Sequence, residues 1–219
     1  MEDRQKLVIW GASGHALVVA DIVRRVGDYE IVGFLDDINP DRHNTKFCGG
    51  RILGGQEQLD VLQRMGVRHL IFGFGNCDAR LRLSALVSKK GFSLATAVHP
   101  RATVAIDVSV GQGTVIAAGA VVNPGSSIGE NVIVNTCASV DHECVIGDGA
   151  HICPGAHLAG RVTVGRGAWI GIGAIVIGRV RIGMGSLVGA GAVVTKDIPD
   201  GVIASGVPAR VIRKTVRNE

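Results

Sequence analysis

The sequence feature that most constrains the fold is a strict six-residue repeat in the second half of the chain. From Val104 to Val194, every sixth residue is Val, Ile or Leu, through sixteen consecutive hexads. The fifth position of each hexad, from Val108 to Ile198, is always small or β-branched. A helix has 3.6 residues per turn and drifts out of a period of six, so the repeat does not fit helices.

Short parallel strands joined by tight corners do fit this period. One hexad then forms one face of a three-sided prism, three hexads form one coil, and the first and fifth positions point into the core. Coils stack at the normal strand spacing of about 4.8 Å. The 32 glycines suit tight corners, because glycine adopts dihedral angles that other residues resist. The repeat therefore predicts an all-β domain, a parallel β-helix of hexapeptide repeats.

The first half of the chain has a different pattern. Apolar runs at 7–10, 30–35 and 69–74 predict strands, and helical spacing predicts helices at 16–26, 56–65 and 79–90. Alternating strands and helices indicate a small parallel, Rossmann-like α/β sheet. We therefore expect two domains, residues 1–97 and residues 98–219, the second ending in a C-terminal tail. The hexad period stops after Val194, and the tail VVTKDIPDGVIASGVPARVIRK resembles the terminal segment of hexapeptide acyltransferases, which implies that the chain leaves the prism there.

Polar residues follow the predicted strands where such sheets bind ligands, at the carboxyl ends. Gly11 and Gly14 lie in a turn before a helix, and turn amides at a helix N-terminus bind phosphate. Asp36 and Asp37 follow the second strand and are suited to bond a ribose or sugar hydroxyl. A plain tight turn and a solvated strand end remain the alternatives.

The segment from 139 to 160 carries three histidines. In the hexad frame, His142 occupies a third position at a corner, and His151 and His157 occupy sixth positions outside the core. Gly160 follows His142 by one coil of 18 residues, so a position without a side chain lies beside His142. Ordinary surface histidines are the alternative interpretation.

Two acids flank His142. Glu143 is suited to accept the second imidazole proton and so to set the tautomer, and Asp141 competes for that role. The glycine position beside His142 leaves room for an extended ligand to pass there.

Composition narrows the classes of partner. The net charge is +4 and the pI about 9.0, but the chain has no Lys/Arg block, so we expect no nucleic-acid partner. The same charge is compatible with binding of an anionic small ligand. No apolar run approaches the ~18 residues of a membrane helix, so no membrane partner is expected. Five cysteines without a CxxC motif favour a reducing cytoplasm.

Four stretches together carry a resemblance to a known family: WGASGHALVVADIV, the acidic pair at 36–37, NTCASVDHECVIGDGAHICPGAHLAG and GAGAVVTKDIPDGVIASGVPARVI. They resemble the nucleotide-sugar acetyltransferases of bacterial glycan synthesis. The most similar types are the N-acetyltransferases for 4-amino sugars of bacillosamine, perosamine or viosamine type, together with the sialic acid O-acetyltransferase-like proteins.

The resemblance implies acetyl transfer from acetyl-CoA to the amino group, at C4, of a nucleotide-linked amino-dideoxy sugar. It also implies a left-handed β-helix, a homotrimer that binds acetyl-CoA between subunits, and no metal. Catalytic roles fall on His142, Glu143 and Asp141. Acetyl-CoA contacts are expected at His151, Gly160, Ile172, Gly178 and Ala190. Nucleotide-sugar contacts are expected at Gly11, Ser13, Gly14, His15, Asp36, Asp37 and Asn135.

Three alternatives stay open at this stage. In the first, the chain is an O-acetyltransferase whose acceptor is a sugar hydroxyl. In the second, it is a trimeric zinc lyase of carbonic anhydrase type, and His142, His151 and His157 hold the zinc. In the third, it is a solenoid without a catalytic histidine that only binds a sugar nucleotide or a partner protein.

Overall fold

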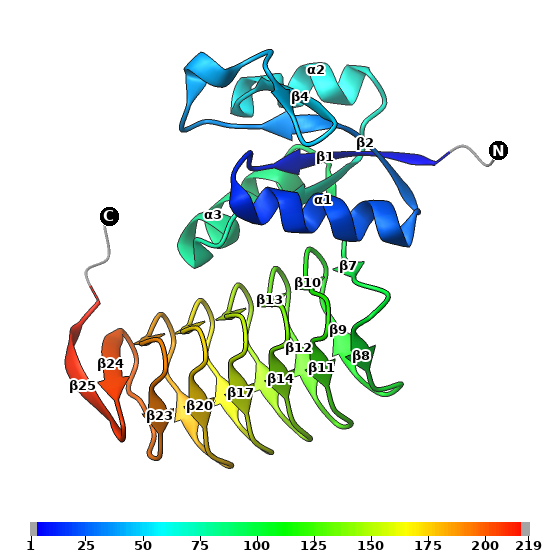
Figure 1. The fold of residues 1–219 in the computed structure, drawn as a ribbon. Coiled ribbons are helices and arrows are strands. Elements are labelled where there is room, and N and C mark those ends of the chain that lie inside the picture. Colours follow the sequence, from blue (N-terminus) through cyan, green and yellow to red (C-terminus); the bar gives the residue numbers. More distant parts are fainter. Residues whose placement is uncertain (1–3, 216–219) are drawn as a thin grey trace.

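The computed structural model describes residues 4–215, with an α/β domain lying along one side of a β-helix (Figure 1). The elements of the N-terminal domain are β1 (Gln5–Trp10), α1 (Gly14–Val26), β2 (Tyr29–Leu35), η1 (Pro40–Arg42), β3 (Lys46–Phe47), β4 (Gly50–Gly54), η2 (Gln56–Gln58), α2 (Leu59–Arg64), β5 (His69–Phe72), α3 (Cys77–Lys89) and β6 (Ser93–Leu94). Every predicted strand and helix of this half is present. The short antiparallel hairpin of β3 and β4 was not predicted.

The N-terminal sheet has the order β3-β4-β2-β1-β5-β6, and β1 pairs in parallel with β2 and β5. Alternate residues of β1 point to opposite faces, as in any strand. Leu7 and Ile9 pack with α1, whereas Val8 and Trp10 pack with α2 and α3. Because β1 and β2 both end at one edge of the sheet, the polar residues that follow them are brought together there.

The β-helix has three sheets. The first sheet holds β7 (Ala97–Val98), β10 (Val115–Ile116), β13 (Ile133–Val134), β16 (His151–Ile152), β19 (Trp169–Ile170), β22 (Leu187–Val188), β24 (Val202–Gly206) and β25 (Ala209–Lys214). The second sheet holds β8 (Thr103–Val104), β11 (Val121–Val122), β14 (Ser139–Val140), β17 (His157–Leu158), β20 (Ile175–Val176) and β23 (Val193–Val194). The third sheet holds β9 (Ser109–Val110), β12 (Ser127–Ile128), β15 (Val145–Ile146), β18 (Thr163–Val164) and β21 (Arg181–Ile182).

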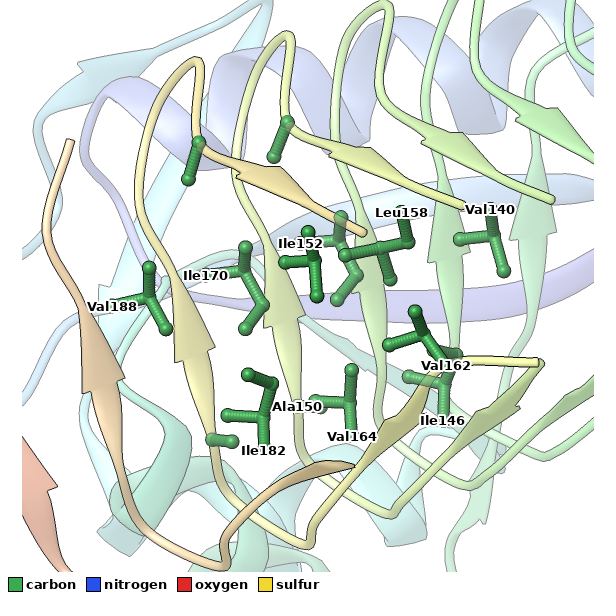
Figure 2. Close-up of a cluster of buried hydrophobic side chains, with 14 of the residues drawn as sticks. Val140, Ile146, Ala150, Ile152, Leu158, Val162, Val164, Ile170, Ile182 and Val188 are labelled. Atoms are coloured by element: carbon green, nitrogen blue, oxygen red, sulfur yellow. The ribbon is translucent and has the colours of Figure 1, made fainter. Parts of the chain in front are cut away.

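The predicted core of the prism is confirmed. First-position residues such as Val140, Ile152 and Val164 are buried, as are fifth-position residues such as Ala150 and Val162 (Figure 2). The coils wind in the left-handed sense that was expected. Val98, one hexad before the first predicted repeat, also packs on this core, so β7 spans the expected boundary between residues 97 and 98.

The C-terminal segment departs from the expectation that the chain leaves the prism after Val194. Ile198 bridges to Ile182, and β24 pairs in parallel with β22 at an offset of 16 residues, as in Leu187 with Ile203. Earlier coils pair at 18, as in Trp169 with Leu187. The chain thus completes one shorter coil, and β25 then turns back antiparallel on β24.

The two domains share a hydrophobic cluster. Ala16, Val19 and Ala20 of α1 are buried together with Val115 and Ile133, which point outward from the first sheet. The N-terminal domain therefore covers the first sheet and leaves the second and third sheets outside this contact (Figure 1).

Candidate functional site

A cavity of about 420 Å³ lies at the carboxyl ends of β1 and β2. Four residues predicted to face a nucleotide sugar line it, namely Gly11, Ser13, Asp36 and Asp37. Its other lining residues include Trp10, Leu35, Ile38, Phe74, Arg82 and Leu83. An apolar wall with a few polar groups is typical of a small-molecule site.

The glycine turn leads from β1 into this cavity and then into α1. Gly11 has φ of 130°, and a Cβ there would lie 2.8 Å from the Gly73 carbonyl oxygen, so only glycine fits. Ser13 is the N-cap of α1, but its side chain makes no capping hydrogen bond, and the first turn holds no acidic residue. The amides that begin at Gly14 thus remain available to an anion.

The acidic pair has two distinct environments. Asp36 is buried, and its side chain accepts hydrogen bonds from the amides of Ile38 and Asn39 and pairs with Arg42 at 3.3 Å. Asp37 lines the cavity and accepts a hydrogen bond of 2.5 Å from Trp10 Nε1. Asp36 therefore shapes the loop, and Asp37 fixes an aromatic ring in the cavity wall.

His142 lies at the prism edge between the second and third sheets, with its side chain 53% exposed. Its Nδ1 is 3.0 Å from Glu143 Oε2, so Nδ1 donates to the carboxylate and Nε2 is left to accept a proton. Arg161 and His142 together lower the pKa of Glu143, which stays ionised. Asp141 instead bonds the His142 amide and Asn123 Nδ2, each at 2.8 Å. Of the two acids, Glu143 is the one that contacts the imidazole.

The expected neighbour of His142 is in place. A Cβ at Gly160 would collide with the His142 imidazole, so the ring lies directly over this glycine. Gly178 continues the same prism edge, which we name the His142 edge. Ile172 and Ala190 lie on the edge between the first and second sheets. The residues expected to contact acetyl-CoA thus occupy both edges of the second sheet, apart from His151.

His151 lies where the N-terminal domain covers the first sheet, a contact region that we name the junction. The hexad frame places His151 outside the prism core, but the N-terminal domain shields it from solvent. It is 5% exposed, and its ring centroid is 4.4 Å from that of Trp169 and 6.2 Å from that of His15. Asn135 Oδ1 accepts from the Thr136 amide, so Asn135 Nδ2 donates to His151 Nε2 at 3.1 Å. The structure therefore joins His15, Asn135 and His151, which were assigned to two different ligands.

Both junction histidines are neutral. Burial, reinforced by the charge of Arg80, lowers the pKa of His15 to about 4 and that of His151 to about 3. His15 Nε2 and His151 Nδ1 are buried without a hydrogen-bond partner in the structure. These rings can orient a neighbour or a ligand, but they cannot readily carry charge.

Arg80 on α3 joins the two domains and was missed by the sequence analysis. It is 1% exposed and uses all five N–H donors on backbone carbonyls. It bonds Phe74 and Gly75 in the N-terminal domain and Asn131, Gly149 and Ala150 in the β-helix. No sequence signal indicates this role, because its partners in the β-helix are main-chain atoms 51 to 70 positions away.

The three histidines of the zinc hypothesis lie apart in one chain. His142 is on its edge, His151 is on β16 of the first sheet, and His157 is on β17 of the second, where it contacts Ser139 Oγ at 2.8 Å. Within residues 4–215, no three His, Cys, Asp or Glu side chains gather as metal ligands. Nor is any helix in that range long and apolar enough to cross a bilayer.

Two family models match the chain: the PglD N-terminal domain over residues 6–87 and the bacterial transferase hexapeptide (six repeats) over residues 161–196. A comparison with curated proteins gave no match. Among solved structures, PerB from Caulobacter crescentus, in complex with CoA and GDP-perosamine, is 39% identical, with a TM-score of 0.87. That match covers 94% of this chain and 97% of PerB.

Two further structures are similar over nearly the whole chain. The acetyltransferase domain of PglB from Neisseria gonorrhoeae FA1090, in complex with acetyl coenzyme A, is 39% identical, with coverage of 96% and 100% and a TM-score of 0.89. WeeI from Acinetobacter baumannii AYE is 27% identical, with coverage of 95% and 100% and a TM-score of 0.85. A histidine-to-asparagine variant of the Caulobacter perosamine N-acetyltransferase was also solved with CoA and GDP-perosamine.

Proposed function

Because the chain belongs to the family of hexapeptide-repeat nucleotide-sugar N-acetyltransferases, we propose that it transfers acetyl from acetyl-CoA to the amino group of a nucleotide-linked amino-dideoxy sugar. The observation that carries the proposal is the His142–Glu143 pair, which leaves Nε2 free above Gly160. The pair lies in a chain that also has a nucleotide-sized cavity.

The sugar amine attacks the thioester carbonyl, and His142 Nε2 takes the proton that the amine loses. The new C–N bond forms as the C–S bond breaks, and the sulfur leaves with the bonding electron pair. The proton on Nε2 then passes to the thiolate, which restores neutral His142. Glu143, ionised and bonded to Nδ1, stabilises the imidazolium in between.

The N-terminal domain supplies the nucleotide-sugar site in this proposal. The free amides of α1 at Ser13 and Gly14 hold the diphosphate, and Asp37 and Asn76 face the nucleoside in the cavity. His15 and Asn135 act from the junction, by orienting the sugar end of the ligand. Acetyl-CoA runs along the second sheet between the edges that carry Gly178 and Ile172.

A single chain does not bring its cavity to its own His142. The N-terminal domain covers the first sheet, whereas His142 lies on the opposite edge of the three-sided prism, between the second and third sheets. The second sheet also exposes apolar side chains, with Ile175 46% and Ile177 43% exposed. We therefore infer a homotrimer in which the His142 edge of one copy meets the cavity of another.

Mixing two inactive variants tests this shared site. His142→Asn removes the base, and Ser13→Trp fills the cavity, so each homo-oligomer is inactive. Mixed oligomers formed by co-expression regain activity only if a site takes His142 from one chain and the cavity from another, because some sites then carry neither defect. Activity that stays at the level of the separate variants, in oligomers shown to be mixed by mass spectrometry, contradicts the shared site.

The activity itself is tested with the purified protein, acetyl-CoA and UDP-, GDP- and dTDP-linked 4-amino-4,6-dideoxy sugars. Thiol release, followed with a chromogenic disulfide, is expected with one of these sugars and identifies the nucleobase that the cavity selects. Thiol release only with hydroxyl acceptors would identify the reaction as O-acetylation. No release with any acceptor would refute the proposal. Since acetyl-CoA and reduced thiols belong to the cytoplasm, we place the reaction there.

A further inference from the structure

A third side chain holds the His142–Glu143 pair. Arg161 lies one coil of 18 residues beyond Glu143, and its amide donates to the His142 carbonyl oxygen at 2.8 Å. Its guanidinium spans the Glu143 carboxylate, with Nε 2.9 Å from Oε2 and Nη2 3.3 Å from Oε1. Glu143 Oε2 is the same oxygen that accepts from His142 Nδ1.

Stability does not explain this arrangement. Glu143 and Arg161 have φ of 57° and 62°, in the left-handed region that favours glycine, and glycine occupies the matching corner at 125. Both side chains are about half exposed, and an exposed ion pair contributes little to stability. The contact of a guanidinium with both oxygens of the carboxylate, next to a proposed base, therefore points to a functional role for the pair.

We propose that Arg161 is a positioning residue for acetyl transfer, which clamps the Glu143 carboxylate and through it aims the His142 imidazole over Gly160. The clamp leaves Glu143 one rotamer, because a guanidinium that spans both oxygens fixes the carboxylate plane. It also shares Oε2 with His142, which limits the stabilisation of the imidazolium. This inference rests on the proposed function and extends it by one residue.

The charges around His142 determine what removing the arginine does. Asp141, Glu143 and Asp107 are the acids of the His142 corner and of the coils before it, and Arg161 and Arg179 are the bases of the next two coils. His157 lies on the second sheet and lines a shallow hollow together with Asp141. Without Arg161, His142 loses its nearest positive charge and has an unshared carboxylate, so its protonated form is favoured.

Arg161→Gly tests the clamp, because glycine suits φ of 62° and the fold is retained. We expect kcat to fall about tenfold, less than the ~10²–10⁴-fold of a lost general base. The acid limb of the kcat/KM profile moves to higher pH, because a positive charge next to the Glu143 carboxylate is removed. Arg161→Lys, which keeps the charge without the two-oxygen contact, lowers kcat with little movement of that limb.

Arg179→Gly is the matched control. Arg179 occupies the same corner position one coil on, at φ of 64°, and its guanidinium makes no hydrogen bond to any residue within 4–215. This variant keeps the wild-type acid limb and saturated kcat. An Arg161→Gly enzyme with wild-type kcat and pH profile, or an equal loss in Arg179→Gly, would overturn the inference.

A second measurement separates this inference from the proposed function. Imidazole NMR titration of His142 in the wild type and in Arg161→Gly reports the clamp without turnover. An upward shift of the midpoint in Arg161→Gly supports the clamp even if no acceptor is acetylated, an outcome that counts against the proposed function alone. An unchanged midpoint contradicts the clamp whether or not the enzyme is active.

Discussion

Two histidine clusters in this molecule have opposite surroundings. At the His142 edge, the ring is half exposed and bonded to an ionised Glu143. At the junction, beside Arg80, His151 is buried and His15 is half-buried, and both are neutral. The chemistry of a histidine is set by what surrounds it: solvent and a carboxylate favour the protonated ring, whereas a covering domain and a buried cation favour the neutral ring.

The largest effect that separates the clusters is expected from His142→Asn. Loss of the general base lowers kcat by about 10²–10⁴-fold, because no other group takes the proton from the amine. The measurement is thiol release at saturating acetyl-CoA, with binding of the nucleotide sugar followed by calorimetry. Binding is expected to be retained, because the cavity lies on the other domain.

His69→Gln is the control for that substitution. His69 is on β5, its ring tilted by 55° to that of Tyr29 with 5.2 Å between the centroids, and it contacts neither cluster. Its turnover stays at the wild-type level. A His142→Asn enzyme with more than a tenth of wild-type kcat would show that His142 only orients the amine.

Arg80→Met breaks the junction instead. The substitution leaves five main-chain carbonyls without their donor, so the free energy of unfolding falls by roughly 3–5 kcal/mol. Urea unfolding measures it. The charge of Arg80 also helps to keep His15 and His151 neutral, so both titrate at higher pH in this variant. A decrease in the free energy of unfolding of less than about 1 kcal/mol would mean that water replaces the guanidinium as the hydrogen-bond donor.

The difference between the clusters also explains what the sequence could predict. A fixed period converts spacing into stacking, so the contact of His142 with Gly160 follows from an offset of 18. The same arithmetic applied to Glu143 finds Arg161, a signal that the sequence analysis did not use. The adjacency of Glu143 suggested its bond to the imidazole, and only coordinates showed that Asp141 turns to the backbone.

The junction, by contrast, was beyond prediction. The hexad frame states that His151 lies outside the prism core, but it does not state which sheet another domain covers. Arg80 binds carbonyls, which every residue has, so no residue type marks its partners. The C-terminal coil was missed because its offset of 16 residues breaks the period while the strands still pair.

The junction should make stability depend on pH. The pKa values of about 4 for His15 and about 3 for His151 lie below the value of 6.5 in the unfolded chain, so the unfolded state binds more protons between these limits. Stability is complete above pH 6.5 and is lost as the pH falls toward 4, by about 1.4 kcal/mol per pH unit for each histidine. Urea unfolding at pH 7, 6, 5 and 4.5 measures the slope.

Two variants show which cluster causes this slope. His151→Gln and His15→Gln each remove one titrating group, so each lowers the slope by about 1.4 kcal/mol per pH unit. Equal slopes in the wild type and in His151→Gln would mean that the junction opens to water before either ring is protonated.

The smallest effect is expected from Asp141→Asn, at the exposed cluster. Asp141 accepts from Asn123 and from the His142 amide, and these hydrogen bonds lower the pKa of its carboxyl. An asparagine oxygen still accepts from that amide, so His142 keeps its place and kcat falls only about twofold to fivefold. Steady-state kinetics compares it with Glu143→Gln, which loses the charge that touches the imidazole and is expected to cost more. If Asp141→Asn proved the more damaging of the two, the acid that serves His142 would be Asp141, and the bond to Glu143 would be secondary.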